Sequence, residues 1–160
     1  MLGKPYAGWT KFQLGSEETQ YSLSFLNDIA NEWLTQAIHG LKTLDVFSVH
    51  GFCEPGRVIC TVSYWSCYVI FEDDDRAPTC HGVNHLHVSM LDFCKKLHED
   101  ISGNLEDWVH WDDSMILDDL DEGEDEETAF DNRRAEIQQK LDELEALIKE
   151  NEENFEGLFF

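Results

Sequence analysis

The sequence predicts an α+β fold in which a mainly antiparallel sheet is flanked by helices, followed by an acidic linker and a C-terminal heptad-patterned helix. Three observations predict it. Apolar residues recur at helical spacing in 25–41 and again after Ser89, β-branched segments lie between them, and acidic residues gather late in the chain. With 160 residues, of which 42% are hydrophobic, the chain can form one ordinary domain and is not wholly disordered.

The first expected elements are a short strand and an amphipathic helix. Residues Trp9 to Leu14 have the pattern of an edge strand that ends at Gly15. A helix is expected over 25–41, capped by Ser24 and ending near Gly40. Its apolar residues share one face: Leu26, Ile29, Trp33, Ala37, Ile38 and Leu41.

Two strands are expected next. Residues Val46 to Cys53 alternate in polarity, and 54–57 form a tight turn with proline in its second place and glycine in its third. Residues 58–71 are expected to form one long strand. Because apolar side chains occupy both of its faces, this strand is expected at the centre of a sheet covered by helices.

A second helix and a last strand complete the expected body of the protein. Ser89 and Asp92 have the spacing of a capping box. The helix that follows has one apolar face, made by Met90, Leu91, Cys94, Leu97 and Ile101. Trp108, Val109 and Trp111 are expected to form a short final strand, with Trp108 in the core.

Charge divides the chain into three regions. The 34 acidic and 11 basic residues give a net charge of −23. Residues 1–97 contain 7 basic and 11 acidic side chains, a net charge of −4, whereas 98–160 contain 4 basic and 23 acidic side chains, a net charge of −19. Segment 118–127 is nearly pure carboxylate and cannot be buried, so we expect a solvated linker between a globular domain, 1–117, and a C-terminal helix, 128–160.

The charge also excludes several kinds of partner. Gripping a phosphate backbone requires cationic groups, so direct nucleic-acid binding is not expected, and an anionic membrane surface repels the chain. The longest apolar stretch, 58–71, is shorter than the roughly 20 residues of a membrane-spanning helix. With no secretory apolar segment in 1–9 and an odd number of cysteines, five, we expect a cytoplasmic protein with reduced thiols.

The C-terminal helix has a heptad seam. Thr128 and Asp131 have capping-box spacing, and apolar residues then follow in steps of four and three. Four aliphatic side chains form the stripe: Ile137, Leu141, Leu144 and Ile148. Two alternatives stay open, a contact between two copies in a homodimer and a helix folded back on its own body. We expect the stripe to serve assembly more than partner binding, because a narrow stripe suits another helix.

No motif predicts catalysis or a cofactor. Cys80, His81, His85 and His87 form the one metal-like cluster, but Cys80 and His81 adjoin each other, which is awkward for one tetrahedral site. No local sequence activates a cysteine, and the Gly51 to Gly56 spacing lacks the Lys-Ser/Thr of a phosphate loop. We therefore expect no catalytic residue, no metal and no cofactor.

Acidic clusters beside large rings are the remaining signal. One cluster is Glu72, Asp73, Asp74 and Asp75, and the other is Trp111, Asp112 and Asp113. Carboxylates speed the encounter with a basic protein, and buried rings supply affinity. We predict that these seven residues contact a basic partner.

Several short motifs resemble immunity proteins of bacterial contact-dependent growth inhibition systems. The motifs occur in this order: Leu23-Ser24-Phe25, Trp33-Leu34, Gly40-Leu41, Glu54-Pro55 at a hairpin, Phe71-Glu72-Asp73, Cys80-His81-Gly82, and Trp108 in acidic surroundings. The likeness is greatest to immunity proteins that neutralise ribosomal-RNA nuclease toxins. It spans about residues 9–113, and the acidic linker and the helix after it have no counterpart in the pattern.

The resemblance implies a non-catalytic toxin inhibitor. Such proteins bind the nuclease domain of a toxin in the cytoplasm and block its active site or RNA-binding surface. Nuclease domains are basic because their substrate is a polyanion, which agrees with the net charge of −23. The alternative is an acidic nucleic-acid mimic of the phage anti-restriction or anti-CRISPR type. A mimic would carry charge along its whole length, whereas −19 of the charge lies in 98–160.

Overall fold

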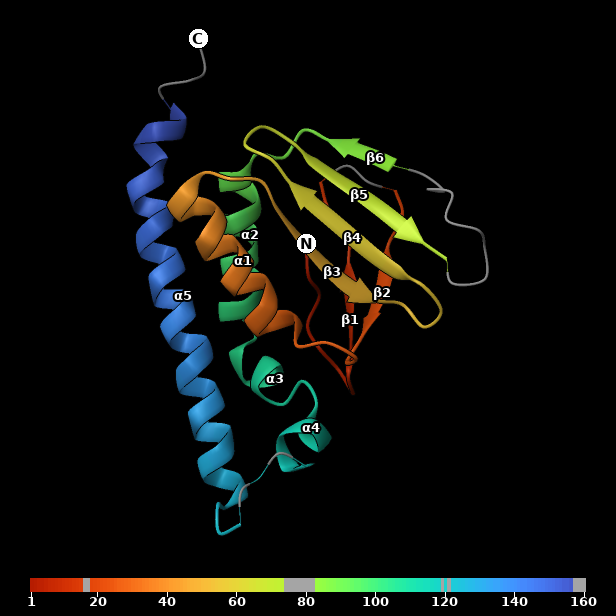
Figure 1. The fold of residues 1–160 in the computed structure, drawn as a ribbon, viewed down its shortest axis with the longest axis vertical. Helices are drawn as coiled ribbons and strands as arrows, with labels where there is room; N and C mark the ends of the chain where they lie inside the picture. Colours follow the sequence, from red (N-terminus) through yellow and green to blue (C-terminus); the bar gives the residue numbers. More distant parts are fainter. Residues whose placement is uncertain (16–17, 74–82, 119, 121, 157–160) are drawn as a thin grey trace.

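A computed structural model of the chain describes residues 1–15, 18–73, 83–118, 120 and 122–156. It confirms the α+β class, with a two-stranded and a four-stranded antiparallel sheet and, in the described residues, five helices (Figure 1). The elements in chain order are β1 (Trp9–Phe12), β2 (Tyr21–Ser24), α1 (Ile29–Thr43), β3 (Phe47–Phe52), β4 (Arg57–Val62), β5 (Cys67–Glu72), β6 (Val83–Leu86), α2 (Met90–Ser102), α3 (Leu105–Val109), α4 (Asp113–Asp118) and α5 (Glu126–Glu156).

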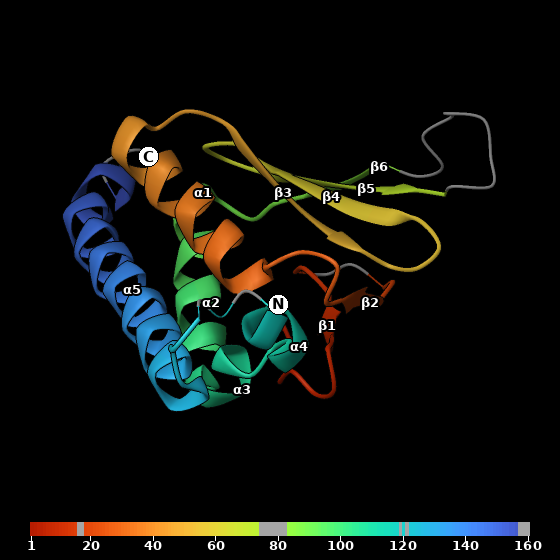
Figure 2. The ribbon, with the colours of Figure 1, turned by 60° about the horizontal axis from the view of Figure 1, so that its bottom comes forward.

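The larger sheet is covered on one face. Its strand order is β3-β4-β5-β6, each pair antiparallel. The side chains of Val49, Cys60 and Val69 lie on the covered face and are 3%, 0% and 0% exposed. In Figure 2, α1, α2 and the β1–β2 hairpin lie on that side, and no element of the described chain covers the other face.

The single long strand expected over 58–71 is wrong, because a turn divides it into β4 and β5. The backbone N–H of Ser63 donates to the carbonyl of Ser66 (2.9 Å), and the Ser63 hydroxyl donates to the same carbonyl (2.8 Å). Even-numbered residues of β4 and odd-numbered residues of β5 point into the core. Because the buried positions switch from even to odd at the turn, the segment 58–71 has apolar residues at both even and odd positions. The two strands β4 and β5 do lie at the centre of the sheet, as expected.

Two other expected elements, the first helix and the final strand, differ from expectation. Residues 21–24 form β2, so the first helix begins at Ile29 and Asp28 caps it by accepting from the N–H of Asn31 (3.3 Å). The helix continues past Gly40, where any Cβ would lie 2.3 Å from the Phe47 ring, so glycine permits this close packing. Residues 105–109, expected in part as a strand, form α3.

The expected Ser89 cap of the second helix is confirmed. The hydroxyl of Ser89 accepts from the N–H of Asp92 (3.0 Å) and donates to its carboxylate (2.8 Å), so Ser89 caps α2. The capping box expected at Thr128 is wrong. Helix α5 begins two residues earlier, and the carboxylate of Asp125 accepts from the N–H of Thr128 (2.8 Å).

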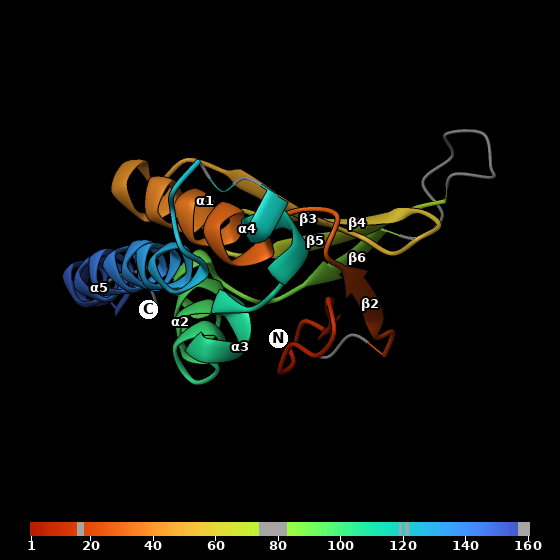
Figure 3. The ribbon, with the colours of Figure 1, turned by 90° about the horizontal axis from the view of Figure 1, so that it is seen from below.

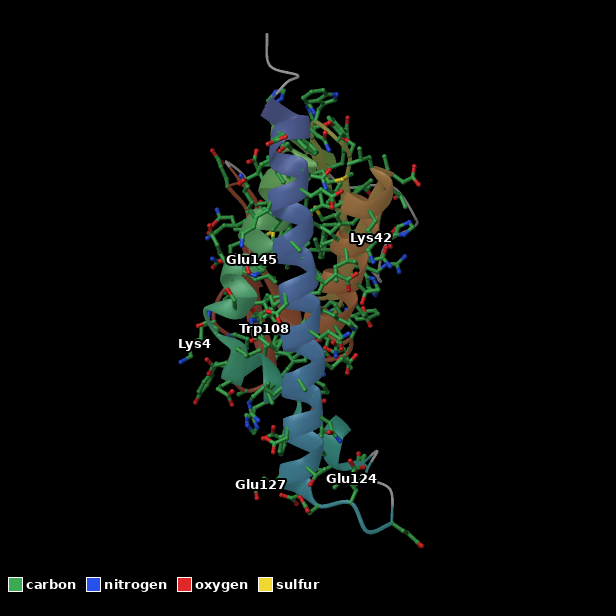
Figure 4. The ribbon with its side chains drawn as sticks, turned by 90° about the vertical axis from the view of Figure 1, so that its left-hand side faces the viewer. Lys4, Lys42, Trp108, Glu124, Glu127 and Glu145 are labelled. Atoms are coloured by element: carbon green, nitrogen blue, oxygen red, sulfur yellow. The ribbon has the colours of Figure 1, made fainter. Side chains whose placement is uncertain are left out.

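Helix α5 packs against both α1 and α2 and lies in front of and between them in the view of Figure 4 (see also Figure 1). Its four seam residues are buried: Ile137 0%, Leu141 1%, Leu144 0% and Ile148 7% exposed. They belong to the same hydrophobic core as Trp33 of α1 and Phe93 of α2. Fold-back is therefore the alternative that the structure adopts.

Two expectations are corrected by this packing. The seam formed by Ile137, Leu141, Leu144 and Ile148 is covered by the chain's own helices and so is not exposed for pairing with a second copy. The boundary at residue 117 does not separate two cores, because the helix after the linker completes the core of the body. The physical reason is that α1 and α2 both present apolar faces that the sheet alone does not cover.

Contacts at the C-terminal end of α5 hold it in register. The buried Asn151 donates from Nδ2 to the carbonyl oxygens of Leu41 (3.3 Å) and Leu147 (2.9 Å). The ring of Phe155 stacks on Tyr64, with centroids 4.3 Å apart. Asn151 is therefore a polar seam residue satisfied within one chain.

We expect Leu144→Ala to lower the free energy of unfolding by about 2–5 kcal/mol, because it leaves a cavity at a fully buried site. Urea unfolding measures this change. The exposed Gln139→Ala in the same helix is the control and should change stability by less than about 0.5 kcal/mol. An unfolding midpoint that rises with protein concentration would instead indicate that the seam holds two copies together.

Candidate functional site

Acidic residues are concentrated at one end of the molecule. Residues 105–131, which include α3, α4, the linker and the first turns of α5, contain 13 acidic side chains and no lysine or arginine. Figure 3 shows that α3, α4 and the beginning of α5 lie together at this end. We call this segment, residues 105–131, the acidic end; two of its aspartates, Asp119 and Asp121, lie outside the described residues.

Arg133 attaches the acidic end to the body. Its guanidinium donates to both carboxylate oxygens of Asp28, at 2.6 and 3.0 Å. The same side chain donates to the backbone carbonyls of Val109 (3.0 Å) and Trp108 (3.2 Å) in α3. One arginine therefore joins α5, the N-terminal cap of α1 and the end of α3.

The Asp28–Arg133 pair is partly removed from water, with side chains 25% and 12% exposed. Burial alone raises the pKa of Asp28, but the hydrogen bonds and charge of Arg133, with hydrogen bonds from Asn31, outweigh it and hold that pKa below its ordinary value. Asp28 is therefore a carboxylate at neutral pH, and its pairing stabilises the fold most when it is ionised.

Trp111, predicted as an exposed anchor for a partner, is a core residue. It is 3% exposed, its Nε1 donates to the carbonyl of Asn27 (3.1 Å), and its ring lies 5.2 Å from that of Trp108. The assignment of Trp111 to a docking surface is thus wrong, because in a helical segment positions 108 and 111 lie on the same inward face. Trp108 is 0% exposed, which confirms its place in the core.

The two aspartates beside Trp111 differ in exposure. Asp112 is half-buried, and its Oδ1 accepts from the N–H (3.0 Å) and hydroxyl (2.6 Å) of Ser114. Asp113 is exposed and lies 3.0 Å from the Nδ1 of His110. Of the three residues predicted here, Asp113 presents the most accessible carboxylate.

The other predicted cluster lies elsewhere. Glu72 ends β5 and forms an ion pair with Arg57 across the sheet (2.6 Å), and Asp73 follows it. Asp74 and Asp75 lie outside the described residues. Figures 1 and 2 show the end of β5 well apart from α3 and α4, so the structure does not bring the two predicted clusters together.

Within the described residues, several carboxylates of the acidic end have no cation beside them. Arg134 pairs with Glu106 (2.6 Å) and Asp131, and Lys4 lies 3.5 Å from Asp107. Glu122, Glu126 and Glu127 are exposed, and none forms an ion pair within the described residues. Figure 4 shows Glu124 and Glu127 at the lower end of α5, away from the cationic Lys42.

A hollow at the sheet edge was not predicted. It has a volume of about 410 Å³ and is lined by Asn31, Glu32, Trp33, Thr35, Gln36, Ser48, Val49, His50 and Lys140. Its residues come from α1, β3 and α5. The sequence held no signal for it, because it depends on β3 being an edge strand and on α5 folding back beside α1.

Burial makes the thiols of Cys53 and Cys94 poor nucleophiles at neutral pH. Cys60, Cys67 and Cys94 are buried, and burial with the nearby Cys67 raises the pKa of Cys94 far above its ordinary value. Burial also raises the pKa of Cys53, to about 11. Cys80 and His81 lie outside the described residues, and within the described residues no group of three potential metal ligands was found. His85 and His87 lie on the surface with ring centroids 4.9 Å apart.

Comparison with known protein families, with curated proteins and with solved structures finds no match for this chain. Among the described residues, no helix combines the length and apolar character needed to cross a membrane.

We expect Asp28→Asn to lower the free energy of unfolding at pH 7 by about 1.5–3 kcal/mol, because it removes the charge that Arg133 faces and keeps a capping side chain. Since the pKa of Asp28 is lowered by folding, its contribution is present above the unfolded-state pKa of about 4 and is lost as pH falls through the lower folded-state value. The difference between variant and wild type should thus shrink in acid.

Urea unfolding of both proteins at pH 7 and at progressively lower pH measures this difference. The exposed Glu153→Gln is the control for removing a charge from an acidic chain. A penalty for Asp28→Asn that is equal at all pH values would show that the ion pair does not contribute.

Proposed function

We propose that this chain is a non-catalytic immunity protein that acts in the cytoplasm, where it binds a basic nuclease toxin domain and blocks its active site or RNA-binding surface. The observation that carries the proposal is the acidic end, where 13 carboxylates occur in 27 consecutive residues without a lysine or arginine. The motifs that resemble contact-dependent growth inhibition immunity proteins support the same function. The acidic end is the surface that we assign to the toxin.

Electrostatics gives the acidic end its role. A nuclease domain has a positive groove because it binds a polyanion, and a protein carboxylate can take the place of a phosphate there. Carboxylates gathered at one end produce a focused field, which raises the rate of encounter with a positive surface. Glu122, Glu126 and Glu127 suit this role best, because they are exposed and have no cationic partner in the described structure.

The arrangement favours an inhibitor with one binding end over a nucleic-acid mimic. A mimic needs negative charge along an extended surface at phosphate-like spacing. Along the middle of α5, several glutamates are paired with lysines, among them Glu136 with Lys140 (3.1 Å) and Glu145 with Lys149 (2.9 Å). Glu143 also pairs with Lys42 of α1. These pairs reduce the negative field along the middle of α5, whereas Glu122, Glu126 and Glu127 of the acidic end have no ion pair within the described residues.

Co-expression with a panel of contact-dependent growth inhibition nuclease domains tests the proposal. We expect the chain to restore growth of cells that produce at least one of these toxins and to bind its catalytically inactive form. Growth that is restored against none of the panel would contradict an immunity function. Protection against a restriction or CRISPR nuclease in place of a toxin would favour the mimic.

We expect the triple variant Glu122→Gln, Glu126→Gln and Glu127→Gln to lower the association rate constant with the toxin domain by about tenfold at low salt. The dissociation rate should change much less, because long-range attraction acts mainly on encounter. Stopped-flow fluorescence at several salt concentrations measures both rates, and the effect should fade as salt screens the charges.

The control is the triple variant Asp142→Gln, Glu150→Gln and Glu153→Gln, which removes three exposed carboxylates from the rest of α5. It should slow association by much less than the variant at the acidic end. Equal effects of the two triple variants would show that net charge alone, and not its position, controls association.

A further inference from the structure

Among the described strands, β3 is an edge of the four-stranded sheet and pairs with one neighbour, β4. Its pairing is defined by the hairpin, where the N–H of Cys53 donates to the carbonyl of Gly56 (2.8 Å). The register pairs Val49 with Cys60 and Gly51 with Val58. In an antiparallel ladder hydrogen-bonded pairs alternate, so residues 47, 49, 51 and 53 bond to β4. The backbone groups of Ser48 and His50 therefore point away from β4.

An independent contact agrees with this assignment. The carbonyl of His50 accepts from Nε1 of Trp33 (2.8 Å) and from Nδ2 of Asn27 (3.1 Å), neither of which belongs to the sheet. Within the described residues, no hydrogen bond engages the N–H of Ser48, its carbonyl, or the N–H of His50. The outer edge of β3 therefore carries three backbone groups without a partner in the described structure: the N–H and carbonyl of Ser48 and the N–H of His50.

The unpaired edge opens into a hollow. The cavity of about 410 Å³ described above is lined by Ser48 and His50 on one side and by Asn31, Thr35 and Gln36 of α1 on the other. Ser48, Thr35 and Gln36 are exposed, and Val46, just before the strand, is 61% exposed. An edge strand beside a groove is the geometry by which sheets accept an added strand.

The charges in the groove favour a cationic segment. Among the described residues that line it, Lys140 has the one cationic side chain, and its ammonium is bound by Glu136 (3.1 Å) and by the amide oxygen of Asn31 (3.1 Å). The carboxylate of Glu32 accepts from the neutral amide of Asn27 (2.8 Å). The lining therefore leaves one carboxylate without a cation among the described contacts.

The groove also adjoins the acidic end. Asn27 binds His50 through its side chain, and its own carbonyl accepts from Nε1 of Trp111. One residue thus separates the end of the groove from the segment that carries Asp112 and Asp113. A basic protein attracted to the acidic end would arrive beside the free edge of β3.

We infer that an extended, lysine- or arginine-containing segment of the basic partner adds to β3 as a fifth strand and occupies this groove. The inference rests on the proposed function and specifies how the same partner is held after encounter. Backbone hydrogen bonds with Ser48 and His50 supply part of the affinity, and cationic side chains face Glu32. A second copy of this chain is disfavoured as the occupant, because two molecules of net charge −23 repel each other.

A peptide supplies the direct test. The probe is an acetylated and amidated heptapeptide in which lysine alternates with valine, and the comparison peptide has glutamate in place of lysine. We expect the lysine peptide to slow amide hydrogen exchange at Ser48 and His50 at least about tenfold at saturation, as burial in a ladder does. The glutamate peptide should have little effect. Unchanged exchange at both amides with the lysine peptide would overturn the inference.

The variant Ser48→Pro removes the outward N–H of Ser48 without breaking the β3–β4 ladder, and proline is tolerated on edge strands. We expect it to weaken peptide binding at least about tenfold, whereas Ser48→Ala, which keeps the N–H, should stay within about twofold. A cooperative thermal unfolding transition is the check that each variant is folded. If Ser48→Pro does not fold, the exchange measurement on the wild type decides.

Three further results separate this inference from the proposed function. Full binding of a toxin domain by folded Ser48→Pro would overturn strand addition and leave the immunity function intact. Failure to neutralise any toxin would overturn the function, while the peptide measurement still tests the edge. A third result concerns a second copy of the chain. If protection of the Ser48 amide from exchange increases with protein concentration without any peptide, and light scattering gives a doubled mass, then a second copy occupies the groove and the inference is overturned.

Discussion

The burial of the α5 seam between α1 and α2 is the constraint on which the rest of the structure depends. Leu141 and Leu144, 1% and 0% exposed, close a core that the sheet covers from the other side. Near its two ends the helix is held by Arg133 against Asp28 and by Asn151 against the carbonyl of Leu41. Arg133 also donates to the carbonyls of Val109 and Trp108, and so it holds the beginning of α5 beside α3 within the acidic end.

Fold-back also explains how so acidic a chain keeps a stable helix. Helix α5 has few cations of its own, and α1 and α2 each add one beside it, Lys42 facing Glu143 and Lys95 at 2.9 Å from Glu152. Exposed pairs of this kind contribute little individually, about 0–1 kcal/mol. Their effect here is to reduce repulsion along the middle of the helix, while apolar burial supplies the stability. Unpaired carboxylates remain at the N-terminal end, where Glu126 and Glu127 form no ion pair within the described residues.

Local patterns predicted the elements well, and contacts distant in sequence account for the errors. Helical periodicity located α2 and the buried stripe of α5, and the Ser89 cap is confirmed. Periodicity could not tell whether Leu141 meets a second copy or α1, because both present an apolar face. The two residues at the centre of the β4–β5 turn, Tyr64 and Trp65, have the composition of a strand. The turn is revealed only by the buried positions, which are even-numbered before it and odd-numbered after it. Trp111 was misassigned because neighbouring carboxylates indicate a surface even when the ring points inward.

Native-state hydrogen exchange on α5 tests the central claim most directly. If the seam completes the core of a single chain, the amides of Leu141 and Leu144 should open with the same free energy as those of Trp33 and Leu34 in α1, independent of protein concentration. Helix and body would then unfold as one cooperative unit. Amides of α5 that exchange well before those of α1, or whose protection increases with concentration, would show that the helix is not an integral part of this core.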